Sequence, residues 1–178
     1  HDEGVRDGTT VEGLGQLKPA FIAEGRVTAG NASILSDGAS AVLVAEVDFA
    51  RRQGWEIIAL IEDYCTSGLA PAQVMSAPIP AINTLLERNG LSVEQVDIFE
   101  HNEAFAAASC AVAKKVGIPD DKFNLHGGAV ALGHPLGSSG SRCLITMLGV
   151  MRRVDASNGI VTLCLGGGNA VAMLVKRA

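Results

Sequence analysis

Positive charge and long apolar runs are both scarce in this sequence of 178 residues. Lys and Arg number 14 against 19 Asp and Glu, the formal net charge is −5, and no basic run exceeds a pair. This distribution argues against a nucleic-acid partner. No apolar run reaches the length of a membrane span, which argues against a membrane partner. Internal repeats, linkers and low-complexity segments are also missing, so we expect a folded domain of ordinary size.

Cysteine is present but not in pairs that bind a metal or form a disulfide framework. The four cysteines, at 65, 110, 143 and 164, lie far apart and form no CxxC motif. Cys65, Cys110 and Cys143 sit in apolar runs, and we interpret them as small buried hydrophobic residues. This usage fits a reducing, cytoplasmic location. The sequence starts at His1 without a signal-like segment, and we expect it to be a piece of a longer protein.

Alternating strand and helix patterns predict an α/β domain. Residues 1–40 are rich in Gly, Ser, Thr, Asn and Asp and are predicted to be mostly loop, leading into a domain over 41–178. We expect a mixed central sheet of about five strands with helices on both faces. The predicted strands are 41–47, 57–65, 96–100, 159–165 and 169–176, and the predicted helices are a short one ending at 53, then 78 or 80 to 88, 103–116 and 138–153.

The stretch 127–142 contains five glycines, one proline, one histidine and no acidic residue. Glycine permits tight backbone geometry, and Pro135 fixes the chain just after His134. We therefore expect His134 on a stiff turn near the positive end of a buried helix. Such a histidine is either a structural hydrogen-bonding group or a catalytic one. The stretch lacks the Lys-Ser/Thr ending of a P-loop, so it does not favour nucleotide phosphate.

Two further loops carry reactive groups, at Asn102-Glu103 after one strand and at Cys164 beside Gly166 after another. Each has a structural interpretation: Asn102 as a helix N-cap, Glu103 as a partner of the helix dipole, Cys164 as part of the core. Three successive glycines beside Cys164 favour chemistry, because exposed backbone N–H groups form oxyanion holes. A metal site from the thiol and nearby histidines matches no usual ligand spacing.

Four motifs, in order, resemble the C-terminal half of the thiolases. They are Asn102-Glu103-Ala104-Phe105-Ala106, Gly127-Gly128 with Gly133-His134-Pro135-x-Gly137-x-Ser139-Gly140, Cys164-x-Gly166-Gly167-Gly168, and Thr28-Ala29-Gly30-Asn31-Ala32-Ser33 with Asp37-Gly38. The opening Asp2-Glu3-x-x-Arg6 is also similar, so the resemblance covers essentially the whole chain. Two residues depart from the family pattern: His101 replaces an apolar residue and His126 an asparagine.

The resemblance implies transfer of an acetyl group between coenzyme A thioesters. It implies that Cys164 is the acid/base at the alpha carbon, that His134 activates a nucleophilic cysteine and binds the thioester oxygen, and that Asn102 holds a water beside it. The Gly166 N–H would form a second oxyanion hole. No sequence context here matches the nucleophile, so we expect the N-terminal half of the same enzyme to supply it and the isolated chain to be inactive.

The same resemblance predicts how substrate is held. Ser33, Ala104 and Phe105 match positions along the pantetheine channel, and Met75 and Arg6 are further candidates for the coenzyme A and acyl pocket. No cofactor is implied, since the coenzyme A thioester is the substrate, and a homodimer or tetramer is expected. The alternatives are a longer-chain 3-ketoacyl-CoA thiolase and a non-catalytic domain for coenzyme A binding or assembly. A binding domain needs none of Cys164, His134 and Asn102, which argues against it.

Overall fold

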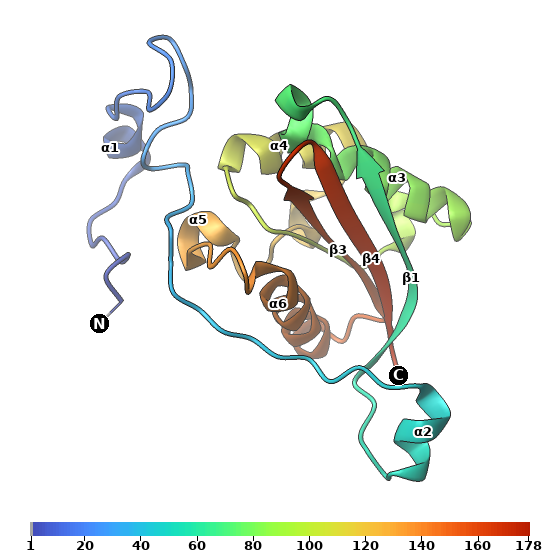
Figure 1. The fold of residues 1–178 in the computed structure, drawn as a ribbon. Helices are drawn as coiled ribbons and strands as arrows, with labels where there is room; N and C mark the ends of the chain where they lie inside the picture. The colour runs from blue at the N-terminus through green and yellow to red at the C-terminus, as the bar shows by residue number, and fades with distance from the viewer. Residues whose placement is uncertain (1) are drawn as a thin grey trace.

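A computed structural model describes residues 2–178 and contains one mixed sheet of four strands (Figure 1). The strands are β1 (Ala59–Gly68), β2 (Ile98–His101), β3 (Asn158–Leu165) and β4 (Asn169–Arg177), in the order β1-β4-β3-β2. β2 runs parallel to β3, whereas β4 is antiparallel to both β3 and β1. Gly166–Gly168 joins β3 to β4 in a hairpin, and the strands predicted over 159–165 and 169–176 are confirmed.

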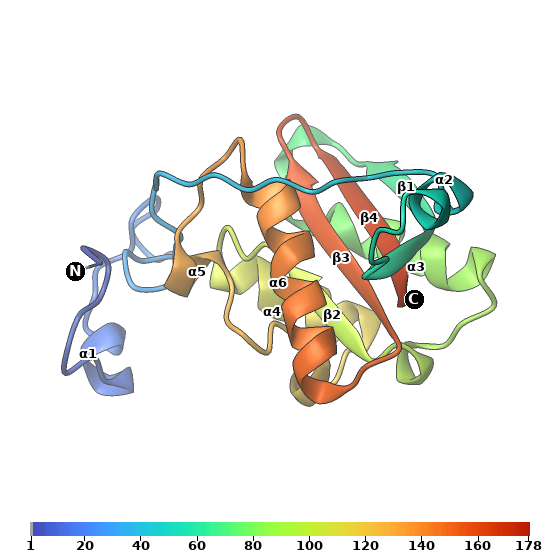
Figure 2. The same ribbon diagram turned by 90° about the horizontal axis from the view of Figure 1, so that it is seen from below.

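Helices cover both faces of the sheet, as predicted. Helices α3 (Pro78–Arg88) and α4 (Ala106–Val116) lie on one face, and α6 (Ser139–Val154) crosses the other (Figure 2). Successive strand residues point to opposite faces, so one hydrophobic cluster contains Phe99, Ile160 and Leu174 and the other their neighbours Ile98, Val161 and Val175. Two cores on one sheet fix the strand ends that carry the reactive groups.

Short elements complete the chain. They are α1 (Val11–Gly15), α2 (Val47–Arg52), α5 (Ala129–Leu132) and three short 3₁₀ helices at Pro71–Ser76, Val93–Gln95 and Asp120–Lys122. Residues 2–46 run mostly without regular structure past α5 and α6 (Figures 1 and 2). Among the described residues, no helix combines the length and apolar character needed to cross a membrane.

The strand predicted over 41–47 is wrong, so the sheet has four strands rather than about five. Residues 41–46 have no regular structure, and α2 begins at Val47. Leu43 and Val44 are exposed, at 76% and 66%. An apolar run becomes a strand only when another strand pairs with it, and none of the described residues does so here.

Three other local predictions are also wrong. Asn102 is not a helix N-cap, since α4 begins at Ala106 and Phe105 occupies its N-cap position. Glu103 lies outside α4 as well, with a φ of 59°, and its carboxylate accepts a hydrogen bond from the Val130 N–H at the start of α5. Cys110 is exposed on α4, whereas Cys65 and Cys143 are buried as expected.

Candidate functional site

A cleft of about 590 Å³ lies beside the end of β3, between the glycine hairpin and the start of α6. Its walls come from six separate parts of the chain. The cleft brings together seven of the nine residues that the sequence nominated: Ser33, Met75, Ala104, Phe105, His134, Cys164 and Gly166.

The loop around Ser33 connects two walls of this cleft through backbone hydrogen bonds. The Ser33 N–H donates to the Ala104 carbonyl at 2.9 Å, and the His134 N–H donates to the Ile34 carbonyl at 3.0 Å. The run 28–33 is therefore more than a plain surface loop. It fixes the spacing between the segment after β2 and the turn that carries His134.

His134 occupies the stiff turn that the glycine pattern predicted. Gly133 has a φ of 89°, and a Cβ at this position would collide with the Ser36 side chain. Pro135 follows His134, and α6 begins four residues later at Ser139. His134 is thus held just before the N-terminal end of a long helix, as expected.

Hydrogen bonds define which nitrogen of His134 carries the proton. Ser139 Oγ donates to the Pro135 carbonyl at 3.0 Å, so the same hydroxyl accepts from His134 Nδ1–H at 2.6 Å. Nε2 is therefore the nitrogen with the free lone pair, and it lies 3.2 Å from Asn102 Nδ2. Burial, followed by the positive charge of Arg142, lowers the pKa of His134 below its ordinary value, which favours the neutral base.

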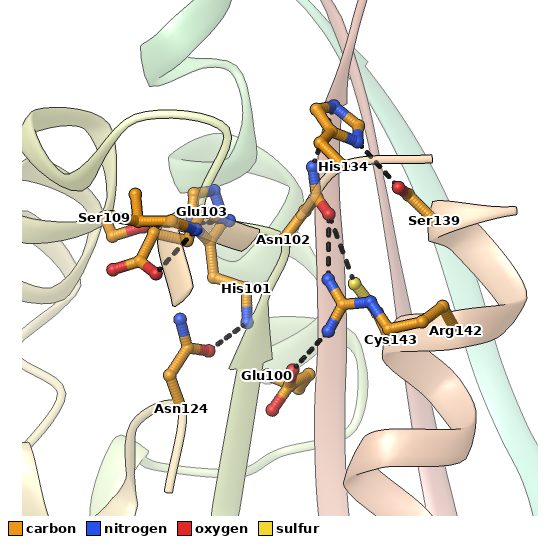
Figure 3. Close-up of polar contacts among 11 residues, drawn as sticks. Glu100, His101, Asn102, Glu103, Ser109, Asn124, His134, Ser139, Arg142 and Cys143 are labelled. Carbon is orange, nitrogen blue, oxygen red and sulfur yellow. Dashed lines mark hydrogen bonds and ion pairs between the residues drawn. The ribbon is translucent and has the colours of Figure 1, made fainter. Parts of the chain in front are cut away.

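Asn102 lies behind His134 and does not line the cleft. Its side chain is buried, and its Oδ1 accepts from Arg142 Nη2 at 3.0 Å and from the Cys143 thiol at 3.6 Å (Figure 3). Arg142 also pairs with Glu100, through Nη1 and Oε1 at 3.2 Å. The amide thus joins His134 to a buried ion pair.

Cys164 is the one thiol among the residues that line the cleft, and it sits near the end of β3. Its Sγ lies 4.0 Å from the Met75 sulfur. Burial raises the pKa of this thiol above its ordinary value, so the protonated form predominates at neutral pH. In the adjoining hairpin, Gly168 has a φ of 95° and no room for a Cβ against the Leu69 carbonyl. Only glycine fits there, and it shapes the wall that carries Gly166.

Two residues that the sequence singled out, Arg6 and His126, lie away from the cleft. Arg6 is exposed in the N-terminal segment and does not line the cleft. His126 lies 3.2 Å from Arg153 Nη1, on the surface. Within residues 2–178, no three His, Cys, Asp or Glu side chains are placed to hold a metal ion.

Sequence reasoning missed the residues that support Asn102 and His134. These are Glu100, Ser139, Arg142 and Cys143. One signal was available, because Arg142 is the only charged residue, histidine aside, in the glycine-rich stretch 127–142. Glu100 carried no comparable signal, since a carboxylate at a strand end is usually exposed.

Comparison with known families decides what this architecture is. The family model described as "Thiolase, C-terminal domain" matches residues 55–177, well over half of the chain. The chain belongs to the thiolase family. The model for the thiolase N-terminal domain matches residues 1–48, so the two models meet close to α2.

Individual thiolases agree with this assignment. An acetyl-CoA acetyltransferase of Pseudomonas aeruginosa is 49% identical over 176 residues, which are 99% of this chain and 45% of that protein. The crystal structure of the Bacillus anthracis acetyl-CoA acetyltransferase matches with a TM-score of 0.95 and 39% identity. Human mitochondrial 3-ketoacyl-CoA thiolase in complex with CoA also matches with a TM-score of 0.95, at 40% identity. Each structural match covers 99% of this chain and 45% of the solved chain.

These matches confirm the α/β thiolase fold and set a limit on what this chain contains. This chain spans less than half the length of the relatives that it matches.

Proposed function

We propose that this chain is the C-terminal catalytic half of a thiolase that transfers an acetyl group between coenzyme A thioesters. The reaction is the condensation of two acetyl-CoA molecules to acetoacetyl-CoA and free coenzyme A, or the reverse thiolysis. One observation carries the proposal: a thiol, an imidazole with an unprotonated Nε2 and a glycine hairpin share one cleft, in Cys164, His134 and Gly166.

In the first half-reaction, His134 acts as a base. Its Nε2 takes the proton of a nucleophilic thiol, and the thiolate attacks the acetyl-CoA carbonyl carbon. Coenzyme A leaves as a thiolate that takes its proton from solvent, so His134 keeps its proton on Nε2, and the acetyl group stays on the enzyme as a thioester. The protonated Nε2–H then donates to the thioester oxygen of the second acetyl-CoA, with Asn102 beside it.

In the second half-reaction, Cys164 moves a proton at the alpha carbon. Cys164 first releases its own proton to solvent, and its thiolate then takes a proton from the methyl group of the second acetyl-CoA. The resulting enolate attacks the acetyl-enzyme carbonyl, a carbon–carbon bond forms and the enzyme thioester breaks. The released nucleophile takes back its proton from His134, and acetoacetyl-CoA leaves. Gly166 N–H would stabilise the oxyanion on the acetyl-enzyme. Because burial keeps the Cys164 thiol protonated, the resting state is ready for the thiolysis direction, in which this thiol donates its proton to the enolate.

The nucleophile belongs outside these 178 residues in this proposal. Of the three other cysteines, Cys65 and Cys143 are buried and Cys110 is exposed on α4, and none of them lines the cleft. The relatives are more than twice as long, which leaves room for an N-terminal half that supplies it. We therefore expect the isolated chain not to turn over thioesters, and the complete enzyme to act in the cytoplasm as a homodimer or tetramer. Measurable acetoacetyl-CoA thiolysis by the purified 178-residue chain would contradict the external nucleophile.

Cys164→Ser in the complete enzyme tests the proposed function. We expect acetyl transfer from labelled acetyl-CoA onto the enzyme to continue, while condensation falls by about 10²–10⁴-fold, the usual contribution of positioned acid–base catalysis. Cys110→Ser is the matched control, because this thiol is exposed outside the cleft, and it should leave both half-reactions unchanged. Normal condensation by Cys164→Ser would show that another group moves the proton.

A longer acyl chain is the second candidate, because human mitochondrial 3-ketoacyl-CoA thiolase is 40% identical, but the 49% identity to the acetyl-CoA acetyltransferase of Pseudomonas aeruginosa favours the acetyl group. Thiolysis rates for acetoacetyl-CoA and for 3-ketoacyl-CoA substrates of increasing length distinguish the two candidates. We expect acetoacetyl-CoA to give the highest kcat/KM. Coenzyme A binding without turnover of any thioester by the complete enzyme would instead indicate a non-catalytic binding domain.

A further inference from the structure

The side-chain amide of Asn102 has only one orientation that its neighbours permit. Arg142 can donate hydrogen bonds but cannot accept them, so the atom 3.0 Å from its Nη2 must be the Asn102 oxygen. The buried Cys143 thiol points at the same oxygen, at 3.6 Å. The amide nitrogen must then face His134 Nε2, at 3.2 Å, and a donor at that position requires an acceptor on the ring.

Arg142 is itself held by a carboxylate with no solvent exposure. Glu100 is 0% exposed, and its Oε1 lies 3.2 Å from Arg142 Nη1. The other carboxylate oxygen and Arg142 Nε have no hydrogen-bond partner among the described residues. A pair that served stability alone would place both guanidinium nitrogens on the carboxylate, as Arg–carboxylate pairs commonly do. Here the guanidinium is divided between a carboxylate and an amide.

The backbone of Asn102 is fixed independently of this ion pair. Its N–H donates to the Thr162 carbonyl at 3.2 Å, and its carbonyl accepts from the Ala129 N–H at 2.9 Å. Loss of Arg142 would therefore leave Asn102 in place but allow its amide to rotate. A rotated amide would present oxygen to His134 Nε2 and favour a proton on that nitrogen, which a base must keep free.

We propose that Arg142, anchored by Glu100, is a positioning residue that fixes the amide of Asn102 and thereby keeps the lone pair of His134 on Nε2. Four side chains form the chain of contacts: Glu100, Arg142, Asn102 and His134 (Figure 3). Ser139 secures the opposite side of the ring by accepting from Nδ1–H. The role of Arg142 in catalysis rests on the proposed function, whereas the assignment of the His134 tautomer does not.

The first test measures the tautomer directly. In the complete enzyme with ¹⁵N-labelled histidine, the His134 nitrogen shifts at neutral pH should report a proton on Nδ1 and none on Nε2. Arg142→Met should move both shifts towards a mixture of tautomers. Arg152→Met is the matched control, since Arg152 is exposed near the end of the same helix, and it should leave them unchanged. Protonation of Nε2 in the unsubstituted enzyme, or unchanged shifts in Arg142→Met, would overturn the proposal.

The second test measures turnover. Small displacements of a catalytic group can cost about 10²-fold in rate, and we expect a loss of that order in kcat for Arg142→Met with little change in KM. Arg142→Lys should recover little of the lost kcat, because the single ammonium group of lysine cannot bond to Glu100 and Asn102 as the two guanidinium nitrogens do. A kcat for Arg142→Met within about twofold of the unsubstituted enzyme, or full recovery by Lys, would contradict a positioning role.

A double variant separates the loss of Asn102 positioning from the destabilisation caused by leaving the Glu100 charge buried and unpaired. Glu100→Gln with Arg142→Met removes both charges, and it should regain the melting temperature that Arg142→Met loses while kcat stays low. Recovery of kcat together with stability would show that the ion pair serves folding only, and would overturn the proposal. If Arg142→Met does not fold, Glu100→Gln alone gives the same decision through the His134 shifts. If the unsubstituted enzyme turns over no thioester, the proposed function fails, and the nitrogen shifts still decide the tautomer.

Discussion

Two histidines stand on opposite sides of Asn102 and show how one fold treats the same side chain in two ways. His134 faces the cleft, with Ser139 of α6 on Nδ1 and the Asn102 amide on Nε2. His101 faces α4 and is 1% exposed. Its Nδ1 accepts from Ser109 Oγ at 2.7 Å and from the Glu103 N–H at 3.3 Å, so its proton lies on Nε2. The two rings therefore hold opposite tautomers.

The second nitrogen of each ring makes the difference in chemistry. His101 Nε2 has no hydrogen-bond partner among the described residues, and the ring stacks on Phe123. His134 Nε2 has a partner in Asn102, and the His134 residue lines the cleft. Burial lowers the pKa of both, in His101 to about 4 and in His134 with further help from Arg142. His101 thus fixes the backbone at Glu103 by accepting its N–H, whereas His134 has an unprotonated nitrogen and lines the cleft.

The largest contrast is expected from removing each ring in turn. In the complete enzyme, His134→Ala should lower kcat by about 10³-fold or more, because both half-reactions lose a positioned base. His101→Leu puts an apolar residue, the kind implied by the family resemblance, at a position without access to the cleft. It should lower kcat by less than about threefold, since the backbone around Asn102 keeps its other hydrogen bonds. Steady-state kinetics with acetoacetyl-CoA measures both. Equal losses would abolish the distinction between the two rings.

The pH dependence of stability sharpens the contrast, because His101 and its neighbour Glu100 act in opposite directions. Below its ordinary pKa of 6.5, the His101 ring takes up a proton in the unfolded chain but not in the folded one until about pH 4. Stability therefore falls as pH drops through that window, by about 3 kcal/mol. Burial, opposed by Arg142, raises the pKa of Glu100 from 4.5 to about 7, so its contribution falls by a similar amount as pH rises from 4.5 to 7.

Single substitutions should reveal how the stability contribution of each residue depends on pH. Between pH 4.5 and 6.5 the two contributions oppose each other in the unsubstituted protein. In Glu100→Gln the His101 contribution remains, so stability should rise with pH relative to the unsubstituted protein. In His101→Leu the Glu100 contribution remains, so stability should fall with pH relative to it. Urea denaturation of the complete protein across this range measures both slopes, and parallel slopes in the two variants would refute the assignment.

Local patterns predicted the elements whose causes lie nearby in the chain. The helix predicted from 78 or 80 to 88 and the two strands that flank the Gly166–Gly168 turn are confirmed. Each depends on residues within one helix or one turn. His134 on its stiff turn belongs to this group, because Gly133 and Pro135 flank it directly.

The predictions that were wrong depended on distant partners. Residues 41–46 have the composition of a strand, but pairing needs another strand, and none of the described residues provides one. Asn102 has the composition of a helix cap, but Arg142, 40 residues later, engages its oxygen instead. Glu100 looks like a surface carboxylate until α6 packs over β2 and buries it. Propensity cannot anticipate such contacts, because they are set by tertiary packing.

The smallest expected effect concerns the two serines that hold the rings. Ser139→Ala removes the acceptor of His134 Nδ1–H, so it weakens the catalytic tautomer and should lower kcat by up to about tenfold, the equivalent of one hydrogen bond. Ser109→Ala removes a donor to His101 Nδ1 and should cost about 1 kcal/mol of stability with kcat unchanged. Kinetics and urea denaturation of the same two preparations compare them. If Ser109→Ala slows turnover as much as Ser139→Ala does, the ring facing α4 contributes to catalysis and the two sides of Asn102 are functionally equivalent.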